Sequence, residues 1–124
     1  MAGLRKLDAI PVENGDTKPG TPDVEYIGGW LELKQVPRPK RETTPIRVPH
    51  YTKQQRVWHR RRWFKGGAVF VLIRIGKDWM LIDGDVASKV LGKLPFNELA
   101  EQARKVWYKK LDHEELLCLL RRGR

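Results

Sequence analysis

The sequence predicts a single α/β domain, residues 1–124, in which a mixed sheet of about four strands is flanked by helices. Three observations predict this class. Residues 23–34 alternate between polar and apolar around two adjacent glycines, residues 68–75 are almost uniformly apolar, and helical patterns precede and follow that run. A chain of 124 residues can remove roughly two thirds of its unfolded surface from water, so it can form its own core. We expect the core at about residues 12–84 and a helical C-terminal extension at 85–124.

Residues 23–34 predict a β-hairpin, because Gly28-Gly29 is typical of a two-residue turn. In that register Glu25 pairs with Glu32, and Asp23 pairs with Lys34. Residues 35–50 contain four prolines and several basic residues, which predicts an extended loop that is mobile until a partner binds.

A helix is predicted to begin at Thr52, because Thr52 and Gln55 have the spacing of a capping box, and to end at Gly66-Gly67. Val57 and Phe64 are expected to mark its buried face. A buried strand at 68–75 and a second strand at 79–82 follow, joined by a short turn. Further helices are predicted at 85–91, 96–109 and 112–122.

The charge of the chain is concentrated in one quarter of it. The formal net charge is +10, and residues 35–65 alone carry ten basic residues and one acidic residue. This excess argues against an ordinary neutral enzyme surface and indicates a polyanionic partner. The single cysteine, Cys118, excludes an internal disulfide and a cysteine zinc site. With no secretory signal at the first residues and no apolar run long enough to span a bilayer, we expect a cytoplasmic protein without membrane contact.

The predicted hairpin carries an acidic face. Side chains alternate along a strand, so Asp23, Glu25, Glu32 and Lys34 are expected on one side of it. Like charges placed opposite each other destabilise a sheet, and a bound divalent cation would explain them because Mg²⁺ binds carboxylate oxygens. The alternative is an ordinary solvated face of charged residues.

Two motifs carry a family resemblance. The segment Gly20-Thr21-Pro22-Asp23, followed after eight residues by Glu32-Leu33-Lys34, resembles the Pro-Asp…(Asp/Glu)-x-Lys signature of the PD-(D/E)xK nuclease superfamily. The likeness is greatest to its small phage-type, VRR-NUC and Holliday-junction-resolvase-like domains. These domains continue with a Gln near the start of the next helix, a Gly-Gly and an apolar strand, here Gln55, Gly66-Gly67 and residues 68–75. The resemblance covers about residues 12–84 and implies a restriction-endonuclease-like fold.

The resemblance implies that Asp23 and Glu32 bind Mg²⁺ or Mn²⁺, with the main-chain carbonyl of Leu33 as a further ligand. Lys34 would orient or activate the attacking water and stabilise charge on the scissile phosphate. Phosphodiester hydrolysis needs both effects, and one or two hard cations supply them. Glu13 is the best candidate for an additional acidic ligand, or else a surface carboxylate. Glu25 is expected at the rim of the site rather than as a ligand.

The basic loop and helix predict a nucleic-acid-binding surface that holds phosphates without reading sequence. The expected contacts are Arg38, Lys40, Arg41, Arg47, Lys53, Gln55, Arg56, His59, Arg60 and Arg62. Gln55 has a second interpretation as a helix cap alone, and His59 as simple polar surface. The tryptophans at 30, 58, 79 and 107 are expected in the core rather than in base stacking. The surplus of leucines at 116, 117, 119 and 120 predicts a homodimer contact.

These observations together predict a Mg²⁺- or Mn²⁺-dependent DNA nuclease. It would be an endonuclease on duplex or branched DNA in phage-like recombination, replication or repair, located in the host cytoplasm if phage-encoded. The alternative is a non-catalytic nucleic-acid-binding protein on the same fold. A sequence-specific restriction enzyme is disfavoured, because so short a chain has little room for a base-reading element.

Overall fold

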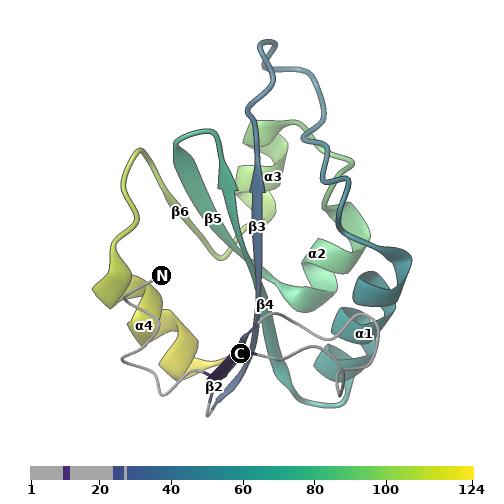
Figure 1. The fold of residues 1–124 in the computed structure, drawn as a ribbon, viewed down its shortest axis with the longest axis vertical. Helices are drawn as coiled ribbons and strands as arrows, with labels where there is room; N and C mark the ends of the chain where they lie inside the picture. The colour runs from purple at the N-terminus through teal and green to yellow at the C-terminus, as the bar shows by residue number, and fades with distance from the viewer. Residues whose placement is uncertain (1–9, 12–23, 27) are drawn as a thin grey trace.

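The computed structural model describes residues 10–11, 24–26 and 28–124. They form one six-stranded sheet in the order β1-β2-β3-β4-β5-β6 (Figure 1). The strands are β1 (Ile10–Pro11), β2 (Val24–Tyr26), β3 (Gly29–Val36), β4 (Ala68–Ile75), β5 (Asp78–Asp83) and β6 (Lys105–Trp107). The helices are α1 (Lys53–Phe64), α2 (Gly84–Val90), α3 (Phe96–Gln102) and α4 (His113–Arg122). The predicted α/β class, with a mixed sheet flanked by helices, is confirmed.

The sheet is mixed because β3 and β4 run parallel, whereas every other neighbouring pair is antiparallel. The connection between β3 and β4 contains a loop and helix α1, as a parallel pair requires. β3 and β4 are paired along their full length, from Gly29 with Ala68 to Val36 with Ile75. This central pair fixes the position of every side chain on β3.

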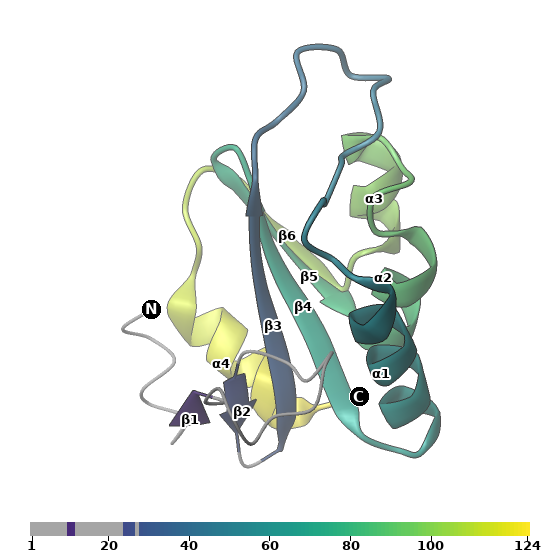
Figure 2. The ribbon, with the colours of Figure 1, turned by 45° about the vertical axis from the view of Figure 1, so that its right-hand side comes forward.

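Helices cover both faces of the sheet. Helices α1, α2 and α3 lie on one side and α4 lies on the other (Figures 1 and 2). Along β4, Phe70 and Leu72 pack in the cluster that contains the α4 leucines, whereas Val71 and Ile73 pack with residues of α2 and α3. Because β4 is buried on both faces, its sequence is continuously apolar.

The hairpin register differs from the predicted one by two residues. Tyr26 pairs with Gly29, and Glu25 pairs with Trp30 rather than with Glu32. Gly29 is the first residue of β3, where it pairs with Ala68, rather than a turn residue. A Cβ atom placed on Gly29 would lie 2.1 Å from the carbonyl oxygen of Ala68. The close approach of β4 at this position leaves no room for a side chain, which explains why a glycine is needed here. The predicted pairing of Asp23 with Lys34 involves a residue outside the described ones.

Two helix predictions are also corrected. The predicted helix 96–109 ends at Gln102, and residues 105–107 form β6 against β5. Val106 pairs with Met80, and the β-branched and aromatic residues of this segment suit a sheet edge. In α1 the buried residues are His59 and Trp63, whereas Phe64 is 68% exposed. Basic residues lie all round α1, so its apolar positions did not predict the face that docks on the sheet.

Residues 37–52 are an irregular segment, which confirms most of the loop predicted at 35–50, although residues 35 and 36 belong to β3. The second half of this segment is anchored. The amide of Ile46 donates to the carbonyl of Leu94 at 2.9 Å, and Ile46, Val48 and Tyr51 are buried against the α2 and α3 side of the sheet. The anchored segment leads directly into Thr52, the N-cap of α1, and so positions the start of the helix.

Most leucines of α4 pack in the core of the same chain. Leu116, Leu117 and Leu120 are buried in the core cluster on the α4 side of the sheet. The surplus of leucines therefore no longer supports the predicted homodimer contact.

Among the described residues, none of the helices is both long enough and apolar enough to cross a membrane.

Candidate active site between β3 and helix α1

Glu32 and Lys34 lie on the α1 side of the sheet. They alternate with Leu31 and Leu33, which pack with the cluster on the α4 side. β2 pairs only with residues 29–31 of β3, so from Glu32 onward no strand among the described residues covers that edge. The predicted Glu-x-Lys motif therefore begins where β2 ends.

Helix α1 brings Gln55 to this motif. Thr52 is the N-cap: its hydroxyl accepts a hydrogen bond from the Gln55 amide at 3.1 Å, and its own amide donates to Gln55 Oε1 at 2.9 Å. This capping box fixes the Gln55 side chain. Gln55 Nε2 then donates to Glu32 Oε1 at 3.3 Å, and Gln55 Oε1 accepts from Lys34 Nζ at 3.2 Å. A single amide group thus joins both charged residues, and Gln55 is both a cap and a member of the cluster.

The charged pair is largely removed from solvent. Glu32 is 1% exposed, and the Lys34 side chain is 10% exposed. Lys34 Nζ lies 3.9 Å from Glu32 Oε2, beyond hydrogen-bonding distance, and donates instead to the carbonyl of His50 at 2.9 Å. In such an environment electrostatic interactions are stronger than in water, so an anionic ligand or a cation here would interact strongly with the pair.

His59 lies beneath the pair rather than at the surface. It is fully buried, which corrects the expectation that it contacts a phosphate or lies in a solvated stripe. Its Nε2 lies 3.8 Å from Glu32 Oε1, and its Nδ1 lies 2.7 Å from the hydroxyl of Tyr51. Burial raises the pKa of Tyr51, with the charge of Arg56 opposing the rise, so the phenol is neutral near pH 7. Tyr51 was not predicted, because only docking of the loop brings it here.

The described part of the predicted metal site consists of Glu32 and the main chain of Leu33. Asp23 and Glu13 lie outside the described residues, as does the side chain of Glu25. Among the described residues, no three His, Cys, Asp or Glu side chains are close enough together to hold a metal ion. The oxygen donors of Glu32 and Leu33 are of the type that Mg²⁺ prefers. The complete ligand set stays a prediction.

The predicted nucleic-acid-binding residues fall into two groups. Arg38 forms an ion pair with Asp78 at 2.7 Å and stacks on the Phe96 ring, and Arg56 donates to the carbonyls of Ser88 and Leu91. These two arginines hold elements of the fold together. Apart from Arg38, which is itself exposed, the exposed members of the predicted set are Lys40, Arg41, Arg47, Lys53, Arg60 and Arg62.

No known family model matches the chain, and no curated protein matches it. Among solved structures, the chain is similar to Hjc, a Holliday junction resolvase from the archaeal hyperthermophile Archaeoglobus fulgidus. The sequence identity is 19%, the TM-score is 0.40, and the match covers 68% of this chain and 71% of that chain. A structural similarity of this degree does not indicate an activity. The evidence for an activity has to come from the site itself.

Proposed function

We propose that the protein is a divalent-metal-dependent DNA endonuclease that hydrolyses phosphodiester bonds at the β3–α1 cluster. The observation that carries this proposal is the joining of Glu32 and Lys34 by the amide of Gln55. The three residues belong to the motifs that resemble the PD-(D/E)xK nucleases. Their convergence from two separate elements supports a shared chemical task.

A purely structural role explains this cluster poorly. Taking an ion pair out of water costs on the order of several kcal/mol per ion, and apolar residues of similar volume often stabilise a fold as well or better. Glu32 is only 1% exposed, it accepts a hydrogen bond from Gln55, and its carboxylate lies 3.9 Å from the Lys34 ammonium. Buried, closely spaced charges of this kind are characteristic of functional sites.

Each residue has a proposed role in hydrolysis. Glu32 and the main-chain carbonyl of Leu33 would bind Mg²⁺ or Mn²⁺ together with Asp23, with Glu13 as a further candidate. When bound, the metal supplies a water nucleophile at neutral pH and offsets charge on the phosphate. Lys34 would orient the attacking water and stabilise the same developing charge, while Gln55 keeps the Lys34 and Glu32 side chains in place. Asp23 is covalently joined to Val24, whose partner on β3 is Leu31, the neighbour of Glu32.

The exposed basic residues support DNA as the substrate. Lys40, Arg41 and Arg47 belong to the segment that precedes α1, and Lys53 and Arg60 lie on α1 itself. Such side chains release counterions from phosphates and provide affinity that does not depend on sequence. We infer that this segment holds the backbone of duplex or branched DNA beside the site, in a role such as recombination, replication or repair.

The test is a cleavage assay with linear, flap and four-way-junction DNA, in Mg²⁺, in Mn²⁺ or in chelator. Wild type should cleave at least one substrate only with metal. Asp23→Ala, Glu32→Gln and Lys34→Met should each lower the rate about 10²-fold or more. Glu98→Gln and Lys110→Met are matched controls, because both residues are exposed and lie outside β3 and α1.

Two results would contradict the proposal. One is wild-type protein that binds DNA but cleaves none of the substrates, which is the result expected of the non-catalytic alternative. The other is cleavage that survives in Glu32→Gln and Lys34→Met while both variants remain folded.

A further inference from the structure

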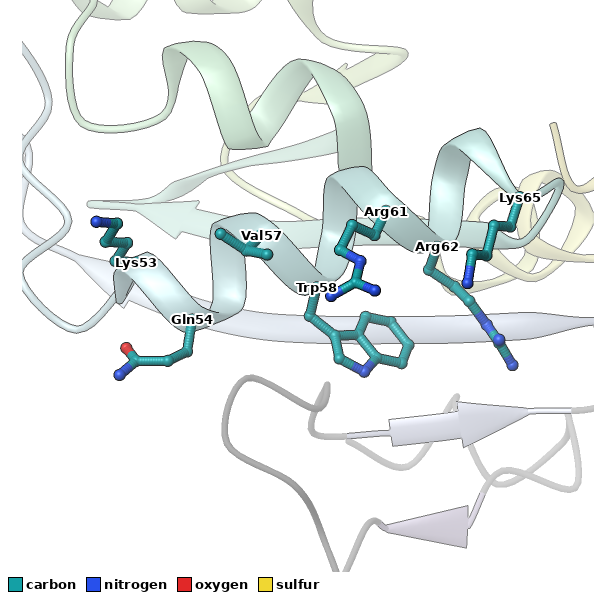
Figure 3. Close-up of a pocket in the computed structure, with 7 residues that line it drawn as sticks. All are labelled: Lys53, Gln54, Val57, Trp58, Arg61, Arg62 and Lys65. Carbon is teal, nitrogen blue, oxygen red and sulfur yellow. The ribbon is translucent and has the colours of Figure 1, made fainter.

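A groove of about 560 Å³ runs along helix α1. Figure 3 shows the side chains that line it, with the indole of Trp58 projecting from the helix between Gln54 and Arg62. The lining residues are Lys53, Gln54, Val57, Trp58, Arg61, Arg62 and Lys65. They recur every three or four positions, so the described part of the lining comes from one face of the helix.

The lining combines charge of one sign with an aromatic surface. Among the described residues that line the groove, Lys53, Arg61, Arg62 and Lys65 are basic and none is acidic. Between them lie the apolar surfaces of Trp58 and Val57. Cations alone would suit any anion, and an apolar surface alone would suit any hydrophobic ligand. Phosphates together with planar bases are the combination that nucleic acid offers.

Trp58 is held in a fixed orientation. Its indole meets that of Trp30 edge-on, with ring centroids 5.5 Å apart and an interplanar angle of 73°. The guanidinium of Arg62 lies over the Trp30 ring at 4.3 Å and reaches the Trp58 ring at 5.8 Å. The aromatic surface and a neighbouring cation are therefore positioned in advance, which lowers the entropy lost on binding.

We propose that this groove binds an unpaired segment of single-stranded DNA, with a base stacked on Trp58 and its phosphates held by the surrounding Lys and Arg side chains. Inside a duplex a paired base shows its faces only to its neighbours in the stack, so away from the duplex ends an indole can stack only on an unpaired base. This inference rests on the proposed function for its link to cleavage, and it narrows the substrate to DNA that carries an unpaired strand.

The groove leads to the candidate active site. From Lys53 to Lys65 it follows about 18 Å of helix, the length of about five stacked nucleotides. Its first lining residues, Lys53 and Gln54, directly precede Gln55, which contacts Glu32 and Lys34. A strand that follows the groove therefore reaches the first turn of α1, where the catalytic cluster begins.

The test measures binding without cleavage. Full-length protein carrying Glu32→Gln, in chelator, is titrated against fluorescently labelled oligo(dT) and against a blunt duplex of equal length. Trp58→Leu removes the indole but keeps an apolar side chain, and should weaken oligo(dT) binding about 10-fold or more while changing duplex binding less than about twofold. Trp58→Phe retains an aromatic ring and should restore most of the affinity.

Exposed lysines provide a second, fold-neutral comparison. Lys65→Ala should weaken oligo(dT) binding and lower the salt dependence by about one released ion. Lys110→Ala, at an exposed residue in the connection between β6 and α4, should not. Equal losses on single-stranded and duplex DNA, or Trp58→Phe no better than Trp58→Leu, would overturn the proposal. Because binding is measured without metal, a protein that never cleaves DNA could still pass this test, so the two proposals fail separately.

Discussion

The ammonium of Lys34 donates a hydrogen bond of 3.2 Å to the side-chain oxygen of Gln55, which lies 21 positions later on a different element. The same oxygen accepts the hydrogen bond from the Thr52 amide that completes the helix cap. One oxygen atom therefore takes part both in the cap of α1 and in holding the Lys34 ammonium.

This shared atom separates two effects of substitution. Gln55→Ala should lower the free energy of unfolding by about 1 kcal/mol through the lost cap, and should reduce cleavage by about 10-fold or more because Lys34 and Glu32 lose their common partner. Thr52→Ala should lower stability by a similar amount while cleavage stays within about twofold of wild type. Urea unfolding and initial cleavage rates check both. If Thr52→Ala lost as much activity as Gln55→Ala, the effect would be one of helix stability only.

The arginines before α1 should divide into structural and DNA-binding residues. Arg38→Ala should lower the free energy of unfolding by about 1–3 kcal/mol, because it leaves Asp78 without its 2.7 Å partner. Arg41→Ala should leave stability unchanged within about 0.5 kcal/mol, and should weaken binding to all DNA sequences with a salt slope smaller by about one. Thermal unfolding and DNA titrations at several salt concentrations distinguish them. A stable Arg38→Ala with weak DNA binding would reverse the assignment.

Gly29 should be intolerant of a side chain. Gly29→Ala places a Cβ atom 2.1 Å from the Ala68 carbonyl oxygen, so β3 and β4 must separate locally, at a cost of about 3 kcal/mol or more. Gly66→Ala is the comparison: Gly66 has a φ of +94° but no atom within 4 Å of the added Cβ, so only backbone strain of about 1–2 kcal/mol is expected. Chemical denaturation measures both values. Equal losses would mean that β3 accommodates the added methyl group at no greater cost than the backbone strain at Gly66.

Alkaline pH should destabilise the fold through its buried tyrosines. Burial raises the pKa of Tyr26 to about 12, with the charge of Arg104 opposing the rise. The neutral phenol therefore contributes its full stability below the unfolded value near 10, and this contribution is lost as the pH rises from about 10 to about 12. Urea midpoints at about pH 9 and about pH 11.5 should fall less in Tyr26→Phe than in wild type. Tyr108→Phe, at a residue that is 65% exposed, should behave like wild type.

The features that the sequence determined by itself are those with a local cause. The capping box of Thr52 and Gln55, the continuously apolar β4 and the end of α1 just before Gly66-Gly67 depend on residues close together in the chain. The Glu-x-Lys spacing likewise placed Glu32 and Lys34 on one face of a strand, because side chains alternate with a period of two.

Tertiary contacts decided the remainder. The hairpin register followed from the packing of Gly29 on Ala68, and the buried face of α1 from its docking on the sheet, which enclosed His59 and left Phe64 exposed. The contact between Tyr51 and His59, and the basic groove around Trp58, also exist only in the folded chain. Burial and non-local pairing depend on which surfaces meet in three dimensions, and neither the charge pattern nor the periodicity of a helix as basic as α1 specifies that.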